Sequence, residues 1–335
     1  APGGTRIVMR NSYEGLPENQ DPDGSALGSL RVTAAHELRH AGQYATSGWS
    51  EVGLWIEIDA VWVEDQVYDD VNDYVRYLQG GSPISDPPLP LDNGGTPSYA
   101  ESVFQFWLAE RLGNGGVLDY WERRRNLPGE HPLDSYDAVL SAGYAPLDSA
   151  FVDFALYNLQ CGSLAAPGSG YTQAAIYPET RFSGDAMALP ASLGSAVDHL
   201  AAKLYRIQGF SGDDEDVLVR LRQPEGLDLQ VASLVVEHDG TRVEEALVMD
   251  GPEASFRLAS SASDIETLYL VVANGDPSND EAVFFADVEQ VPAITPAPVP
   301  TLDDTWNTLT LATGQTRVLS INFANEGPKS STLDY

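Results

Sequence analysis

The chain has 335 residues, of which 43% are hydrophobic, including 6 Trp, 15 Tyr and 10 Phe. This content is typical of a folded protein and argues against an intrinsically disordered chain. The net charge of −32, from 50 acidic and 18 basic residues, repels phosphate backbones and anionic lipid headgroups and so argues against nucleic acid as a partner. Acidic, lysine-poor chains suit an extracellular, saline or hot environment, with solubility alone as the other explanation.

The single cysteine, Cys161, allows no intrachain disulfide and no thiolate metal cluster. No apolar run approaches the roughly 20 residues of a membrane span. The chain opens with Ala-Pro-Gly-Gly rather than Met. We therefore expect an exported and trimmed protein that is secreted or held at the cell surface.

The first half of the chain carries mostly helical patterns. A short strand is predicted over 5–9, and a Pro/Gly turn precedes a helix from Ala26 to about Gly48. The loop over 80–97 is long enough to border a binding cleft. The other predicted helices span 51–67, a short segment ending at Leu78, 99–112, 117–125, 135–142 and 148–160.

Alternating β-type patterns begin after about Leu193. Strands separated by Gly, Asp and Asn turns predict an antiparallel β-sandwich, and the Pro-rich segment 292–300 predicts a stiff linker. The expected fold class is α+β and multidomain: a mostly helical domain over 1–192, a sandwich over 193–290 and a tail over 291–335. The predicted strands are 204–207, 217–221, 227–237, 242–248, 255–258, 267–272, 282–288, 308–312 and 317–323.

The helical region contains His-Glu-Leu-Arg-His at residues 36–40, which fits the H-E-x-x-H pattern. Residues four apart share a helix face, so His36 and His40 can bind one Zn²⁺. Glu37 then lies beside the open coordination position, where it can take a proton from bound water. The pattern also occurs by chance on solvated helices, so further evidence has to come from a third ligand.

Glu57 supplies that evidence, because it interrupts the apolar segment Trp55–Ala60 on the next predicted helix. A buried carboxylate must be paired, protonated or bound to metal, and a catalytic zinc requires a third protein ligand. Glu64 lies two turns further along the same face. There it can accept the outer ring N–H of a ligand histidine. A surface carboxylate is the alternative for Glu64.

Together, the H-E-x-x-H motif, Glu57, Ala60 and Glu64 resemble the gluzincin clan of zinc metallopeptidases. More closely, three runs resemble a poorly characterised group of secreted bacterial metalloproteases over about the first 190 residues. The resemblance implies a zincin-like catalytic domain, zinc as cofactor and a protein or peptide as substrate. The three runs are VTAAHELRHAGQ (32–43), AVWVEDQVYDDVNDY (60–74) and YAESVFQFWLAERLG (99–113).

Two departures from the clan pattern modify this expectation. Only 35 residues precede His36, and no Gly-x-Met-Glu-Asn segment for gripping a substrate amino terminus is present. An endopeptidase is therefore favoured over an aminopeptidase. The resemblance further implies a Tyr or His that stabilises the oxyanion. Tyr99 is the first candidate for this role, and His131 is the second.

Acidic turns offer oxygen ligands for Ca²⁺ at 21–24, 213–216 and 276–281, although none has EF-hand spacing and solvated turns are the simpler explanation. No phosphate loop, nucleophile elbow or basic aromatic groove is present in the sequence. The leading hypothesis is a secreted zinc endopeptidase. The alternative is a non-enzymatic surface or filament protein on a peptidase-derived scaffold, assembling through the sandwich or the tail.

Overall fold

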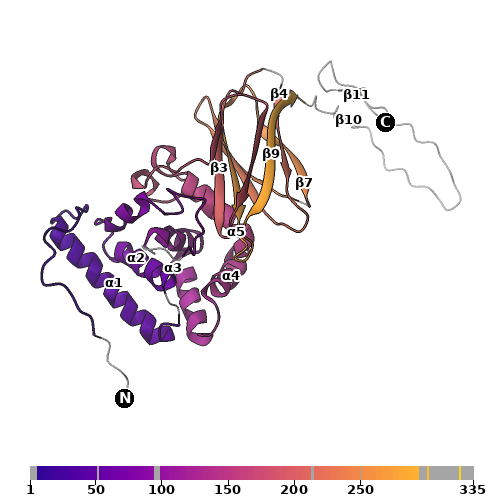
Figure 1. The fold of residues 1–335 in the computed structure, drawn as a ribbon. Helices are drawn as coiled ribbons and strands as arrows, with labels where there is room; N and C mark the ends of the chain where they lie inside the picture. Colours follow the sequence, from indigo (N-terminus) through magenta and orange to yellow (C-terminus); the bar gives the residue numbers. More distant parts are fainter. Residues whose placement is uncertain are drawn as a thin grey trace, which may run out of the picture.

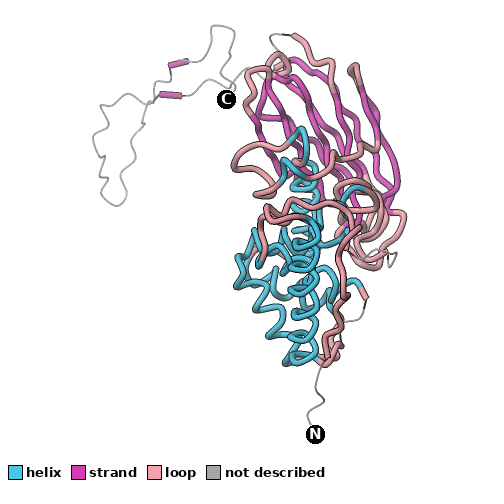
Figure 2. The backbone as a smooth tube through the Cα atoms, turned by 90° about the vertical axis from the view of Figure 1, so that its left-hand side faces the viewer, coloured by secondary structure: helices cyan, strands magenta, loops and turns pink. Residues whose placement is uncertain are grey.

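The computed structural model describes residues 6–50, 53–93, 99–212, 215–249 and 251–293, with the backbone of 300–301 and 324–325. Helices occupy the first half of this chain and strands the second (Figure 1). Figure 2 shows the helical part and the sheets as two regions stacked along the long direction of the molecule. The fold is therefore α+β, as predicted. No helix in the described ranges combines the length and hydropathy that crossing a membrane requires.

Two long helices open the described chain and carry the predicted site. Helix α1 spans Ser25–Ser47 and ends at Gly48, whose left-handed φ of 68° lets its N–H bond the Tyr44 carbonyl. Helix α2 spans Leu54–Val67 and packs alongside α1. The remaining helices are η1 Asp73–Gln79, η2 Ala100–Ser102, α3 Val103–Asn126, α4 Pro132–Gly143, α5 Leu147–Leu159, η3 Gly162–Leu164 and η4 Ala174–Ile176.

Two local predictions in this half are corrected. Residues 6–9 form no strand, and Ile7 and Val8 are exposed, because no strand in the described part of the chain pairs with them. The helix expected to end at Leu78 is a 3₁₀ segment, η1. The break predicted between the helices at 99–112 and 117–125 is confirmed, because α3 is non-helical at Gly113, where φ is 69° and ψ is 175°, while residues 100–102 form the separate 3₁₀ segment η2.

The strands form two main sheets. The five-stranded sheet has the order β1-β3-β8-β5-β6, and the four-stranded sheet has the order β2-β9-β4-β7. All neighbours pair antiparallel except β1 and β3, which are parallel. The strands span β1 Gly184–Ala186, β2 Ala191–Val197, β3 Ala201–Ile207, β4 Glu215–Arg222, β5 Gln230–Glu237, β6 Arg242–Leu247, β7 Glu253–Ser261, β8 Ile265–Asn274 and β9 Ala282–Pro292.

The two sheets pack face to face around one apolar core, to which Leu268 and Leu270 of β8 contribute with Phe284 of β9. The other face of β8 presents Tyr269 and Val271 to the helical core. Strand β8 is therefore buried on both sides, since side chains alternate along a strand. Helix α5 covers this second face, so the helices and the five-stranded sheet share a continuous core.

The strand region begins earlier than the sequence pattern indicates. Strands β1 and β2 start at residues 184 and 191, so residues assigned to the helical domain up to 192 lie in the sheets. Short, small-residue strands such as Gly184–Ala186 carry little alternation to detect. The strands predicted at 308–312 and 317–323 lie outside the described residues. Two-residue pairings are present at β10 Pro300–Thr301 and β11 Ala324–Asn325.

His199 joins the helical and strand regions through two carboxylates. Its Nε2 lies 2.7 Å from Asp92 Oδ1, and its Nδ1 contacts Asp280. Partial burial lowers the pKa of His199, but the two carboxylates outweigh it and raise the pKa above the ordinary imidazole value. Both ring nitrogens can donate at once only in the protonated form.

We expect His199→Gln to lower the Tm most below about pH 6.5, the ordinary imidazole pKa, where the protonated ring contributes its full stabilisation. Because the folded-state pKa is raised, this contribution is lost as the pH rises through that value. Thermal unfolding of both proteins across the pH range checks this. A Tm difference that grows toward alkaline pH would contradict it.

Candidate metal centre

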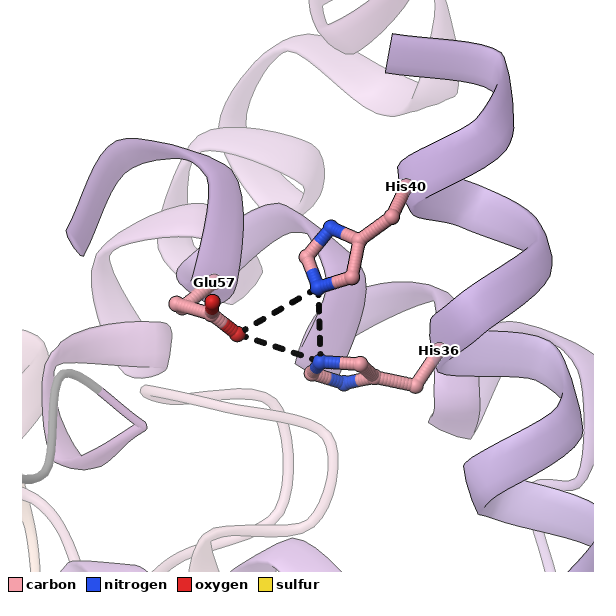
Figure 3. Close-up of side chains that lie close together, drawn as sticks. All are labelled: His36, His40 and Glu57. Atoms are coloured by element: carbon pink, nitrogen blue, oxygen red, sulfur yellow. Dashed lines mark hydrogen bonds and ion pairs between the residues drawn. The ribbon is translucent and has the colours of Figure 1, made fainter. Parts of the chain in front are cut away.

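Helices α1 and α2 bring together the three predicted metal ligands (Figure 3). His36 and His40 lie one turn apart on α1 and point toward α2, from which Glu57 faces them. The Nε2 atoms of the two histidines are 3.0 Å apart, and Glu57 Oε2 lies 3.1 Å and 3.5 Å from those of His36 and His40. Three ligand atoms thus converge on one point.

These separations fit a metal ion. Zinc binds nitrogen and oxygen at about 2.0–2.2 Å in tetrahedral sites, which places neighbouring ligand atoms about 3.3–3.6 Å apart. The observed triangle is slightly smaller and would open by a few tenths of an ångström around an ion. Within the described ranges, no other set of three or more His, Cys, Asp or Glu side chains lies close enough to hold a metal. The residues therefore suit a metal in number, type and spacing.

The outer nitrogens of both histidines have fixed partners. His36 Nδ1 lies 2.6 Å from Glu64 Oε1, and His40 Nδ1 lies 2.7 Å from Gln43 Oε1. A proton on each Nδ1 satisfies both contacts, so an Nε2 that gives up its own proton has a lone pair to offer on the side of Glu57. This is the tautomer that binds metal through Nε2. Glu64, only 6% exposed, occupies the position expected from the sequence.

A network that the sequence analysis missed stands behind His40. Gln43 donates from Nε2 to Asp59 Oδ2 at 2.7 Å and to the Ile56 carbonyl at 2.9 Å. Asp59 is fully buried and also accepts from Arg39 Nε at 2.5 Å. The sequence does contain a sign of this network, because Asp59 interrupts the same apolar segment as Glu57 and Gln43 lies three residues after His40.

The electrostatics of the centre favour positive charge. Burial lowers the pKa of His36, but hydrogen bonds with Glu57 and Glu64 outweigh it and raise the pKa to about 9. Burial raises the pKa of Glu57, but the two imidazoles outweigh it and lower the pKa to about 2. Two carboxylates around two imidazoles thus attract either protons or a cation. Because these compete for the same nitrogens, metal affinity falls as the pH falls.

Glu37 and Tyr99 flank the three ligands. Glu37 is partly exposed and forms no hydrogen bond or ion pair with the described residues, so its carboxylate is free to act on a water molecule. The Tyr99 ring packs edge-on against His36, with ring centroids 5.5 Å apart. Burial, with Glu57 nearby, raises the pKa of Tyr99 to about 12, which keeps the phenol protonated as a donor.

The other predicted sites, His131 and the three acidic turns, are not part of the described metal centre. His131 is exposed, and its Nδ1 accepts the Leu133 N–H as the N-cap of α4. The two aspartates of the 21–24 turn, Asp21 and Asp23, both bind Arg31, and Asp276 accepts from Ser278 within its own turn. In the 213–216 segment, residues 213–214 lie outside the described ranges, and Asp216 pairs with Arg257.

The Glu64 contact yields a test of the ligand geometry. We expect Glu64→Gln to weaken zinc binding about 10- to 100-fold, because a neutral amide orients His36 less strongly than a carboxylate. A competition titration with a chromogenic chelator measures the affinity. Zinc affinity equal to that of the wild type would mean that Glu64 has no part in holding the metal.

The sequence matches no protein-family model and no curated protein. Similar solved structures include the pre-peptidase C-terminal domain of a Bacillus anthracis collagenase, at 9% identity and TM-score 0.23, covering 34% of this chain and 100% of that one. Another is the VP2 subviral particle of infectious bursal disease virus, at 14% identity and TM-score 0.17, covering 31% and 27%. An arabinose-bound α-L-arabinofuranosidase has 12% identity and TM-score 0.18, covering 30% and 19%. These low scores assign neither a fold family nor a function to this chain.

Proposed function

We propose that the protein is a secreted zinc-dependent peptidase, and more specifically an endopeptidase, with a zincin-like helical domain. The observation that carries the proposal is the convergence of His36 Nε2, His40 Nε2 and Glu57 Oε2 within 3.0–3.5 Å of one another. Two imidazoles and one carboxylate leave a coordination position open, as catalytic zinc sites do. The identity of the metal as zinc rests on this ligand set.

Each residue has a defined part in the proposed reaction. When bound, zinc would polarise the peptide carbonyl and acidify a water molecule. Glu37 takes the proton of that water and delivers it to the leaving nitrogen. The Tyr99 hydroxyl donates a hydrogen bond to the oxyanion of the tetrahedral intermediate. Glu64 and Gln43 hold the imidazoles in the required tautomer.

The experiment that tests the proposal is proteolysis of an unstructured protein by the zinc-loaded chain. We expect internal cleavage that a chelator stops and added zinc restores. Internal products would distinguish an endopeptidase from an aminopeptidase. Stoichiometric zinc without any cleavage would contradict the proposal and favour the alternative, a non-enzymatic surface or filament-forming protein on a peptidase-derived scaffold.

A further inference from the structure

Two exposed aromatic side chains lie beside the candidate metal centre. Tyr44 and Trp49 contact each other, with ring centroids 5.4 Å apart, and the Trp49 ring stands 6.5 Å from the ring of His40. Tyr44 is 42% exposed and Trp49 is 43% exposed. Large adjacent aromatic rings left in contact with water are typical of a binding surface.

The backbone fixes Trp49 in this position. Both Gly48 and Trp49 have left-handed φ values, 68° and 60°, a conformation that bulky residues rarely adopt. The indole Nε1 of Trp49 donates to the His40 carbonyl oxygen at 3.1 Å. The ring is therefore tied to the turn of α1 that carries a metal ligand, and it cannot swing freely into solvent.

Helix periodicity places Tyr44 on the side of Glu37. Tyr44 follows Glu37 by seven residues, about two turns, so both side chains lie along one stripe of α1. His36 and His40 lie on the neighbouring stripe and face Glu57. The proposed general base and Tyr44 therefore lie on the same side of α1, and the Trp49 ring contacts Tyr44 there.

We propose that Tyr44 and Trp49 form a subsite that binds an aromatic or large aliphatic side chain of a peptide, next to the bond that is cleaved. This inference rests on the proposed peptidase function and names its substrate class. Two flat rings inclined at 74° suit an apolar side chain, because they bury its area at little cost in conformational entropy. The net charge of −32 further selects uncharged or basic peptides over acidic ones.

The test measures binding without turnover. Zinc-loaded Glu37→Gln protein is titrated by calorimetry with two peptides that are identical except for one Phe or Gly. We expect the Phe peptide to bind at least about tenfold more tightly than the Gly peptide. Trp49→Ala in the same background should abolish this preference. Trp49→Phe should restore part of it. The matched control is Phe285→Ala, which removes another exposed ring, 50% exposed on β9, and should leave the preference intact.

The outcomes separate this inference from the proposed function. Equal affinity for the two peptides, or a preference that survives both Trp49→Ala and Tyr44→Ala, would overturn the aromatic subsite even if the wild type cleaves proteins. A Trp49-dependent preference in a protein that cleaves nothing would support the subsite and contradict the peptidase. Thermal unfolding of each variant confirms that the preference is compared between folded proteins.

Discussion

Glu37→Gln is expected to reduce peptide hydrolysis by about 10²–10⁴-fold while zinc stays bound, because the amide cannot accept the proton of the attacking water. Glu37 touches none of the three ligand atoms and has no partner among the described residues, so its replacement leaves the ligand triangle intact. Initial rates on an internally quenched peptide, together with zinc content by elemental analysis, measure both halves of the prediction.

Glu122→Gln is the matched control, since this carboxylate is exposed on α3 and pairs with Arg125 of the same helix. It should retain wild-type rates. Undiminished hydrolysis by Glu37→Gln would remove Glu37 from the mechanism. A loss of zinc in that variant would mean that Glu37 supports the ligands rather than the water.

Glu57→Ala is expected to weaken zinc binding by more than about 100-fold. Losing only a hydrogen-bond partner of a ligand histidine costs up to about 100-fold, and the loss of a ligand should cost more. The variant loses a direct ligand and leaves two imidazoles with no carboxylate between them. Zinc raises the Tm of any folded chain that it binds, in proportion to the logarithm of its concentration over the Kd. The zinc-dependent rise in Tm should therefore disappear in this variant, together with hydrolysis.

Asp70→Ala serves as the control for Glu57→Ala, because Asp70 is an exposed carboxylate just after α2. It should keep the full zinc-dependent rise in Tm. If Glu57→Ala instead keeps that rise, a different group completes the site, and the assignment of the third ligand is wrong.

The ligand triangle could be predicted from the sequence because it depends on local rules. The four-residue spacing of His36 and His40 follows from the helix period alone. Glu57 and Glu64 stood out as carboxylates in an apolar helix, where burial demands a partner. The α+β order of the chain followed from the change of hydrophobic period near residue 193.

The parts that could not be predicted depend on tertiary contacts. Strand β8 is buried on both faces because α5 covers the sheet, and no local pattern reveals which helix packs there. The 6–9 segment has strand-forming residues, but no strand among the described residues pairs with it. Asp59 lies two residues after Glu57, yet only the packing of α1 on α2 shows that it binds Arg39 and Gln43.

The position of Trp49 is another feature that local sequence rules do not predict. Its conformation depends on two consecutive left-handed residues, and the sequence offers only the preceding glycine as a sign of the turn. The contact with Tyr44 and the bond to the His40 carbonyl follow from the way the chain leaves α1. A sequence pattern does not encode the direction of that exit, so the aromatic pair emerged only from the structure.

X-ray absorption spectroscopy of the zinc-loaded wild type most directly tests whether one ion is shared by residues 36, 40 and 57. We expect one zinc per chain, with two imidazole nitrogens and carboxylate oxygen at about 2.0–2.2 Å and no sulfur. A chain that binds no stoichiometric zinc, or whose bound zinc lacks imidazole ligands, would contradict the account.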